Sequence, residues 1–281
     1  MPVRVLRSVS ELQAWRAELG ERELALVPTM GYLHAGHIAL LEEGRRRVPS
    51  ERGALAISIF VNPTQFNDPS DLDSYPRDEA GDLAKAEAAG ADVAFVPDPG
   101  ELYPAGASTF VEVHGLDANL CGATRPGHFR GVCTIVSKLW LLFRPTVGLF
   151  GQKDYQQLAI VTRMHRDLFL PGEVVGVPTV RESDGLALSS RNARLSDEGR
   201  AAAVAIPRFL DQVQARYDAG ERDAAALIAG AEAALAPGEI HYVSVVDAQD
   251  LQFVDRAEGP ILVALAVFFD GVRLIDNRRL G

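Results

Sequence analysis

The chain has 281 residues, 47% of them hydrophobic and 23% charged, and its formal net charge is −10 at pH 7. This length fits one large α/β domain or two smaller ones, and the acidic balance argues against a general nucleic-acid binder, whose surface would be basic. With only two cysteines, no secretory h-region and no apolar run as long as a membrane span, the chain is expected to work in the reducing cytoplasm, away from membranes and without a disulfide scaffold.

Strand and helix patterns alternate over the first part of the chain. Apolar runs predict strands at 24–27, 54–61, 91–96, 109–113 and 146–150, and the patterns typical of helices lie at 38–47, 78–89, 131–143 and 155–168. Such alternation predicts right-handed crossovers and a mostly parallel sheet. Ligands of these sheets bind beyond the carboxyl ends of the strands, so polar motifs that directly follow a strand are the first candidates for a site.

A different pattern follows the proline- and glycine-containing stretch at 171–178. Helices are expected over 196–217 and 223–235, and strands over 240–246, 261–269 and 272–275. Ser196 is a plausible N-cap, and Asp270-Gly271 between the last two strands is a strong hairpin signal. The sequence therefore predicts an α/β domain over 1–176 and a smaller α+β domain over 177–281.

Two histidines follow the first of the central strands. His34 and His37 are three residues apart, at the turn where the strand at 24–27 gives way to a helix, so they face the same way. A helix N-terminus favours phosphate, and Gly31 and Gly36 let the backbone approach a ligand closely. Two imidazoles there can donate hydrogen bonds to phosphoryl oxygens. The alternative is a tight turn with incidental histidines, and we favour the phosphate site.

Amide side chains follow the strand at 54–61. Asn62 and Gln65 can bind a polar small molecule without burying a charge, although a turn that merely closes the strand fits as well. The polar stretch 67–77 comes next and suits a lid that excludes water, but an ordinary loop fits it better. Further along, Arg125 and His128 precede a helix and either bind an anionic group or belong to a loop and its cap.

The strand at 146–150 also ends in polar residues, Gly151 to Asp154. Lys153 can reach phosphate, and it is one of only three lysines among 28 basic residues, which weakly favours a need for a compact ammonium. Asp154 can accept from ribose hydroxyls or cap the next helix, and Gln157 on that helix can be a ligand or simply solvated. The spacing of a Walker A loop is absent.

Ser189, Ser190 and Arg191 lie in the second predicted domain, in a loop preceded by Gly185. Two hydroxyls and a guanidinium make a plausible phosphate clamp, although by itself this pattern fits a polar loop better.

Taken together, these motifs resemble the pantoate–β-alanine ligase family of the nucleotidyltransferase superfamily. The segments that carry the resemblance follow one another in order along most of the chain, at 28–37, 60–66, 75–77, 120–122, 125–131, 151–157 and 181–192. The resemblance implies a Rossmann-like parallel-sheet domain over 1–176 that binds ATP and pantoate, and a smaller C-terminal domain over 177–281 that closes over ATP.

The activity that the resemblance implies is an ATP-dependent condensation of (R)-pantoate with β-alanine. Pantoate first becomes a pantoyl adenylate with release of pyrophosphate, and β-alanine then displaces AMP to give pantothenate. The reaction would use Mg²⁺ with ATP, and the resemblance also implies a homodimer. Phosphates and water are expected to hold the Mg²⁺, and Asp82 is considered as its ligand only as a guess.

The resemblance also assigns roles to individual residues. It places His37 at the proton-donor position, and His34 and Lys153 on the phosphates. It implies that Gln65 and Gln157 bind pantoate and that Gln65 also contacts β-alanine. The residues it places on ATP are Met30, Gly31, Tyr32, Leu33, His34, Ala35, Gly36, His37, Gly151, Gln152, Lys153, Asp154, Val180, Leu188, Ser189, Ser190 and Arg191. Leu188 stands where the family usually has methionine, a change that nearly conserves volume.

Three other functions compete with this one. A nucleotidyltransferase would use the same histidines but keep the nucleotidyl group on its product, and the amides at 62–65 and the block at 181–192 argue against it. A tRNA synthetase does not fit an acidic chain without room for a tRNA-binding extension. A nucleotide-binding regulatory module would bind ATP without turnover, which would leave both motif histidines superfluous.

Overall fold

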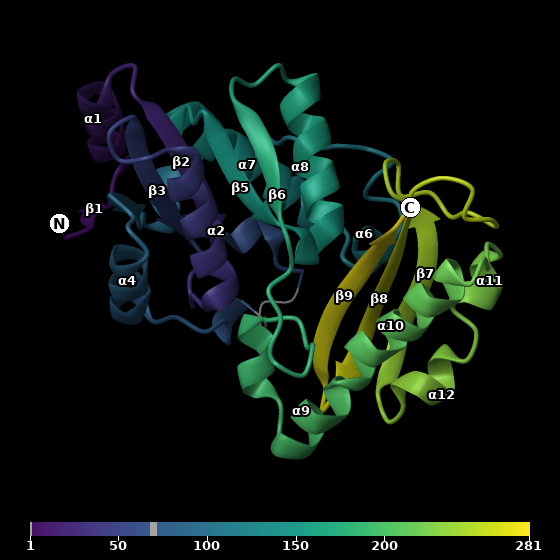
Figure 1. Ribbon diagram of the computed structural model, residues 1–281. Helices are drawn as coiled ribbons and strands as arrows, with labels where there is room; N and C mark the ends of the chain where they lie inside the picture. The colour runs from purple at the N-terminus through teal and green to yellow at the C-terminus, as the bar shows by residue number, and fades with distance from the viewer. Residues whose placement is uncertain (1, 68–71) are drawn as a thin grey trace. The chain divides into compact units, whose positions relative to one another are not determined.

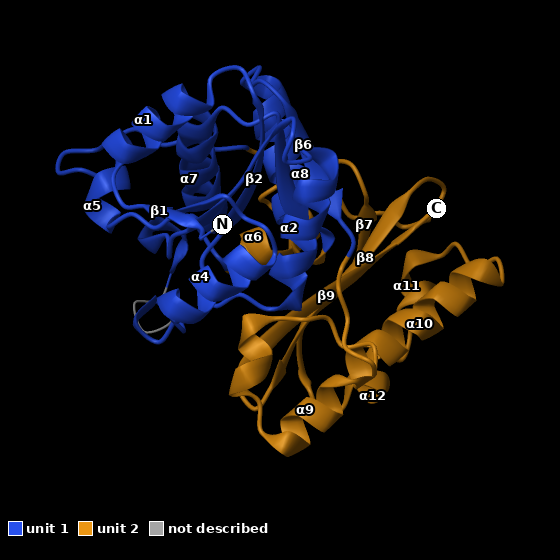
Figure 2. Cartoon of the chain, turned by 60° about the vertical axis from the view of Figure 1, so that its left-hand side comes forward, with its two compact units in different colours: residues 1–113, 125–152, 157–178 blue, residues 114–124, 153–156, 179–281 orange. Residues whose placement is uncertain are grey.

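The computed structural model describes residues 2–67 and 72–281 (Figure 1). Four residues of the predicted loop at 67–77 therefore lie outside the described residues. The chain forms two compact units, the first from residues up to 113, 125–152 and 157–178, and the second from residues 114–124, 153–156 and 179–281 (Figure 2). The second unit thus takes in two short segments from the first part of the sequence.

The first unit is built on a six-stranded sheet with the order β1-β4-β3-β2-β5-β6. Its strands are β1 (Arg4–Leu6), β2 (Glu23–Thr29), β3 (Gly53–Ile59), β4 (Val93–Phe95), β5 (Val147–Gly151) and β6 (Glu173–Val177), and every pairing between them is parallel. The expected Rossmann-like parallel sheet is confirmed. The order runs outward from β2 in one direction and from β5 in the other, so the switch point where ligands bind lies at the carboxyl ends of these two neighbours.

Helices cover both faces of this sheet. They are α1 (Val9–Leu19), α2 (Ala35–Arg47), α4 (Glu79–Ala88), α5 (Pro99–Leu102), α7 (His128–Phe143) and α8 (Tyr155–Asp167). Leu41 of α2 packs with Ala25 and Leu149 of the sheet, whereas a Cβ added at Gly148 would meet Trp140 of α7. Because neighbouring residues of a strand point to opposite faces, α2 and α7 lie on opposite sides of the sheet.

The second unit contains a three-stranded antiparallel sheet, ordered β7-β8-β9. Its elements are α6 (Leu120–Thr124), α9 (Asp197–Ala203), α10 (Ala205–Asp218), α11 (Ala224–Leu227), α12 (Ala231–Leu235), β7 (Glu239–Asp247), β8 (Ile261–Phe269) and β9 (Val272–Leu280). Phe209 and Leu210 of α10 pack with β8 in its core. The predicted hairpin is confirmed, since Asp270 and Gly271 both have positive φ angles, of 51° and 73°.

The predicted strand at 109–113 is wrong. These residues pair with no strand among the described residues, and the amide of Val111 donates to Oγ1 of Thr134 on α7 instead, at 3.0 Å. The apolar residues of this segment therefore do not form part of a β-sheet with any described residue.

Two predicted helices of the second unit are each divided in two. The helix expected over 196–217 breaks at Val204, because Pro207 in the first turn of α10 cannot donate a hydrogen bond back to the preceding helix. The helix expected over 223–235 breaks at Gly230, whose φ is 78°. Ser196 caps α9 as predicted, since its side chain accepts from the amide of Gly199. No helix among the described residues is both long enough and apolar enough to cross a membrane.

Candidate active site

The two motif histidines lie where β2 leads into α2. His34 is the N-cap of α2, and its Nδ1 accepts a hydrogen bond from the amide of Gly36 at 3.1 Å. In return, Nδ1 of His37 accepts from the amide of His34 at 3.3 Å, which completes a reciprocal capping box. The ring centroids are 4.1 Å apart. The expectation that both imidazoles face the same way is thereby confirmed.

These contacts determine which nitrogen of each ring carries the proton. A nitrogen that accepts an N–H has no proton of its own, so each neutral ring is protonated on Nε2. An Nε2–H is a donor suited to a phosphoryl oxygen. The site also has the positive end of the α2 dipole. The arrangement can therefore stabilise negative charge that builds up on a phosphate.

Residues 30–33 link β2 to this helix start. Tyr32 and Leu33 donate their amides to the two carboxylate oxygens of Asp82, at 2.7 and 2.6 Å. Asp82 is 1% exposed. Each of its oxygens thus accepts a backbone N–H, which ties this buried carboxylate to residues 32 and 33.

The predicted amide pair lies at the end of β3, around the 3-10 turn η1 (Pro63–Gln65). Asn62 donates to Oε1 of Gln65 at 3.1 Å and to the carbonyl of Gly131 at 3.0 Å, and it accepts from the hydroxyl of Tyr103 at 2.9 Å. Its amide is therefore engaged within the protein, and Asn62 supports Gln65 rather than presenting its own groups. Nε2 of Gln65 lies 2.8 Å from Sδ of Met30, so the structure brings the amide turn and the β2–α2 link together.

His128 and Arg125 both contact the backbone of Gln65. Nδ1 of His128 lies 2.8 Å from the Gln65 carbonyl, and Arg125 donates to the same oxygen at 3.3 Å. Nε2 of His128 faces the Arg125 guanidinium at 3.1 Å. The sequence left the roles of these two residues open. In the structure both side chains contact the carbonyl oxygen of Gln65, so they support the backbone of the turn that carries its side chain.

Gly151 ends β5, and Gln152 opens the 3-10 turn η2 (Gln152–Asp154) that follows. The strands β2 and β5 are paired and parallel, so Gly151 and the histidine turn lie at the carboxyl ends of neighbouring strands. Gln157 lies on α8 and is half-buried. Its neighbour Gln156 is buried and donates to the carbonyls of Leu116 and Asn119, both at 2.8 Å, which makes Gln156 a structural residue of the second unit.

The remaining predicted residues belong to the second unit. Lys153 and Ser189 line the same small cavity, of about 10 Å³, together with Asp276 and other residues. The amide of Leu188 donates to the carbonyl of Val180 at 3.0 Å, so these two predicted nucleotide contacts are adjacent. Ser189 caps the 3-10 turn η3 (Ser190–Arg194) by accepting from the amide of Arg191.

An ion pair that sequence reasoning missed holds this segment. Arg181 donates to both oxygens of Asp276, at 2.6 and 2.9 Å, and to the carbonyl of Gly185 at 3.0 Å. The hydrogen bonds to Asp276 raise the pKa of Arg181 above its usual value. The Asp276 side chain is only 1% exposed, and a lone acidic residue in strand β9 was the one local signal that could have revealed it.

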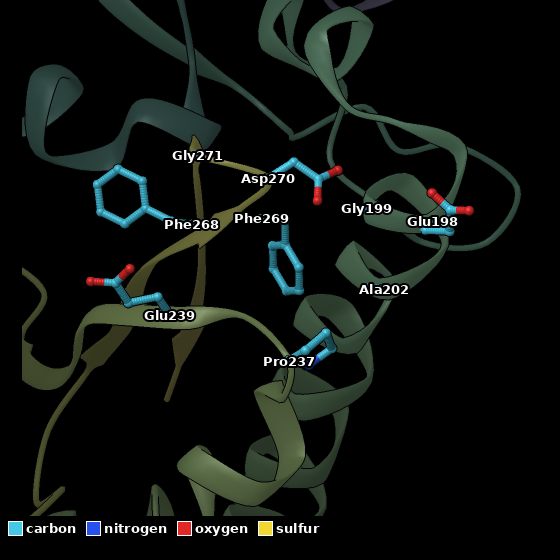
Figure 3. A pocket seen from close by; sticks show the side chains of 9 residues that line it. All are labelled: Glu198, Gly199, Ala202, Pro237, Glu239, Phe268, Phe269, Asp270 and Gly271. Carbon is cyan, nitrogen blue, oxygen red and sulfur yellow. The ribbon is translucent and has the colours of Figure 1, made fainter.

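A larger pocket of the second unit, of about 540 Å³, contains none of the predicted residues (Figure 3). Its lining includes the carboxylates of Glu198, Glu239 and Asp270 and the rings of Phe268 and Phe269. Since carboxylates repel phosphates, this pocket does not suit a nucleotide. Among residues 2–67 and 72–281, no group of three or more His, Cys, Asp and Glu side chains is arranged to hold a metal ion.

Comparisons with known proteins agree with these features. The family model for pantoate-beta-alanine ligase matches residues 4–279. The pantothenate synthetase of Myxococcus xanthus is 50% identical over 99% of this chain and 96% of its own. The crystal structure of pantothenate synthetase from Thermus thermophilus is 44% identical, with a TM-score of 0.92 over 98% of this chain and 99% of that one. The pantoate-beta-alanine ligase of Francisella tularensis, complexed with beta-gamma ATP and beta-alanine, is 30% identical, with a TM-score of 0.81 over 98% of this chain and 97% of that one.

Proposed function

The chain belongs to the pantoate–β-alanine ligase family, and from that membership we propose how its residues carry out the reaction. The protein is an ATP-dependent ligase that joins pantoate to β-alanine. The observation that carries the proposal is the reciprocal histidine cap at the switch point of the sheet, with the Gln65 amide beside the same link. Two donors for phosphate and a neutral amide thus lie on the same unit, which supports an enzyme that activates a carboxylic acid.

In the first step, the pantoate carboxylate attacks the α-phosphorus of ATP. Pantoyl adenylate forms and pyrophosphate leaves. His37 and His34 donate from Nε2 to the phosphoryl oxygens, and His37 acts where charge grows in the transition state. Lys153 adds a compact positive charge on the phosphates.

In the second step, the β-alanine amine attacks the activated acyl carbon, and a C–N bond replaces the acyl–oxygen bond to AMP. AMP leaves with the electrons of the broken bond, and the amine nitrogen releases a proton to solvent. Gln65 and Gln157 hold pantoate through their amides, and Gln65 also contacts β-alanine. Exclusion of water during this step protects the acyl adenylate from hydrolysis. The half-buried position of Gln157 supports its role, and the hydrogen bond from Asn62 to Oε1 of Gln65 holds the Gln65 side chain in place.

We assign the nucleotide to residues 30–37, 151–154, 180 and 188–191, with Asp154 on the ribose and the Val180 backbone at the adenine. The hydrogen bond between Leu188 and Val180 supports their joint assignment. The division into an ATP- and pantoate-binding domain over 1–176 and a smaller domain over 177–281 that closes over ATP remains part of the proposal.

Magnesium enters this proposal together with ATP. Mg²⁺ usually keeps several waters and binds substrate phosphates with one or two carboxylates, so we propose a cation that ATP brings to the site. When bound, it shields the charge of the triphosphate. We also propose that the enzyme is a cytoplasmic homodimer without nucleic-acid or membrane partners, as the family resemblance implies.

Exchange of labelled pyrophosphate into ATP tests the two-step scheme. Without β-alanine, exchange should depend on pantoate, because only a reversible adenylate returns pyrophosphate to ATP. Addition of β-alanine should then release AMP. Net synthesis of pantothenate without pantoate-dependent exchange would contradict the scheme, and a nucleotidyl group retained on the product would indicate the rival nucleotidyltransferase.

A further inference from the structure

We propose that Asp82 is a positioning residue that holds the β2–α2 link, residues 30–33, in the shape needed by the histidine turn. The proposal rests on the proposed function in one respect, since it takes this link to line the ATP site. It assigns to Asp82 a role in the backbone geometry of the site and none in metal binding.

Asp82 lies in the first turn of α4, far from the link in sequence. Its Oδ2 accepts from the Tyr32 amide and its Oδ1 from the Leu33 amide, at 2.7 and 2.6 Å. Distances this short are typical of charge-assisted hydrogen bonds. The carboxylate therefore occupies both amides, so these two N–H groups are not donors for the phosphates of ATP. At this turn, the groups that can bind phosphate are therefore the imidazoles of His34 and His37 and the N-terminus of α2.

The link adopts a backbone conformation that needs such support. Gly31 has a φ of 82° and Tyr32 a φ of 53°, which is the left-handed region that side chains other than glycine disfavour. A Cβ added at Gly31 would lie 2.8 Å from Oδ2 of Asp82, so the close approach of the carboxylate also accounts for the glycine. Asp82 thus stabilises a conformation that Tyr32 alone opposes.

A second residue of α4 contacts the same link. Nζ of Lys85 donates to the Leu33 carbonyl at 2.9 Å, so α4 binds both the N–H and the C=O of Leu33. Leu33 is 3% exposed and directly precedes His34, the N-cap of α2. Through Leu33, the two charged side chains of α4 determine where the histidine pair begins.

The matched variants are Asp82→Asn and Asp78→Asn. An asparagine at position 82 keeps one acceptor but turns an NH2 group toward an amide N–H. We expect Asp82→Asn to lower kcat/KM for ATP by about 10- to 100-fold, the range for a small misplacement of reacting groups. Asp78 caps the same helix through the Gly81 amide at 3.0 Å and does not contact the link, so Asp78→Asn should change kcat/KM less than threefold, i.e. by roughly half a power of ten or less.

Tyr32→Gly distinguishes positioning of the link from a general effect of Asp82 on stability. A general effect would lower ATP affinity equally with tyrosine or glycine at position 32. Glycine removes the left-handed penalty at position 32, so the loss of ATP affinity caused by Asp82→Asn should be at least about 5-fold smaller in the Tyr32→Gly background. Affinity is measured by calorimetry with ATP and Mg²⁺, independently of turnover. If Asp82→Asn does not fold, Lys85→Met replaces it and should weaken ATP binding in the same direction.

The Mg²⁺ dependence separates this proposal from a metal site. The Mg²⁺ concentration that gives half-maximal activity should be the same in wild type and Asp82→Asn. An increase in that concentration, with ATP affinity restored at high Mg²⁺, would overturn the proposal in favour of a metal ligand. Equal effects of Asp82→Asn and Asp78→Asn, or full additivity with Tyr32→Gly, would also overturn it. Failure of the proposed function would instead show as absent pyrophosphate exchange in the wild type.

Discussion

The backbone amide of His34 donates to Nδ1 of His37 at 3.3 Å, while Nδ1 of His34 accepts from the Gly36 amide at 3.1 Å. Each neutral ring is therefore held with its proton on Nε2. The two hydrogen bonds that cap α2 thus also leave an Nε2–H on each ring as a donor for phosphate. The start of the helix and the orientation of the donors therefore depend on the same contacts.

His37→Ala should slow adenylate formation by about 10²- to 10⁴-fold, the usual range for a positioned donor or acid–base group. ATP affinity should change less, because the charge that His37 meets is larger in the transition state than in bound ATP. Single-turnover adenylate formation and calorimetry measure the two quantities separately. A variant that lost mainly affinity and kept its chemical rate would refute the donor role.

His34→Ala should weaken ATP binding as well, because the β- and γ-phosphates are already charged in the ground state. It also removes the N-cap of α2, which costs about 1 kcal/mol of stability. His34→Asn separates these effects, since asparagine can still accept from the Gly36 amide. We expect both variants to bind ATP poorly and only His34→Ala to lower Tm. Normal ATP binding by His34→Asn would show that His34 acts only as a cap.

Lys153→Arg should be badly impaired although the charge is retained. The Lys153 side chain is 18% exposed and lines a cavity of about 10 Å³, which leaves little room for a planar guanidinium. Steady-state turnover with pantoate, β-alanine and ATP measures the effect. Near-normal turnover would mean that Lys153 is only a surface charge.

His128 should carry its proton on Nδ1, unlike His34 and His37. Its Nδ1 faces the Gln65 carbonyl, which only accepts, and its Nε2 faces the Arg125 guanidinium, which only donates. Nitrogen-15 NMR of the imidazoles distinguishes the two tautomers directly. His128→Ala removes the hydrogen bond to the Gln65 carbonyl and should raise KM for pantoate by about tenfold, which corresponds to a loss of roughly 1.4 kcal/mol. The effect on KM for ATP should be smaller. A protonated Nε2 in the wild type would refute this arrangement.

Asp276→Ala should lower the free energy of unfolding by about 3–5 kcal/mol, because it leaves the Arg181 guanidinium without its buried partner. Asp211→Ala is the matched control: Asp211 pairs with Arg278 at 2.8 Å, but its side chain is 67% exposed, so the expected cost is about 0–1 kcal/mol. Chemical unfolding of the full chain measures both. Equal losses would mean that burial does not distinguish the two pairs.

Stability should also depend on Glu43 at acid pH. Hydrogen bonds from Arg46, and then from Arg47, lower the pKa of Glu43 to about 2, from 4.5. A lowered pKa means that the contribution of Glu43 is complete above about pH 4.5 and is lost as the pH falls toward 2. Glu43→Gln should therefore destabilise the protein at pH 7, by about 0.5 kcal/mol per pair, and progressively less below pH 4.5. A cost of Glu43→Gln that stayed constant down to pH 2 would contradict this.

Several features of this protein follow from the sequence by itself. The alternation of strands and helices predicted the parallel sheet, and Asp270-Gly271 predicted the hairpin of the second unit. The spacing of His34 and His37 after a strand predicted that they share one side of a helix start. In each case the signal is local, because the period of a helix or strand and the backbone preference of a turn involve residues a few positions apart.

The tertiary structure decided which polar side chains present their groups and which are used inside the protein. Asp82 binds Tyr32 from 50 positions away, and Asp276 binds Arg181 from 95 positions away. The amide of Asn62 is engaged by Gln65, Gly131 and Tyr103, the last two of them far away in sequence. A buried polar group must find a partner wherever packing supplies one, and that partner is set by contacts distant in sequence, which no local pattern contains.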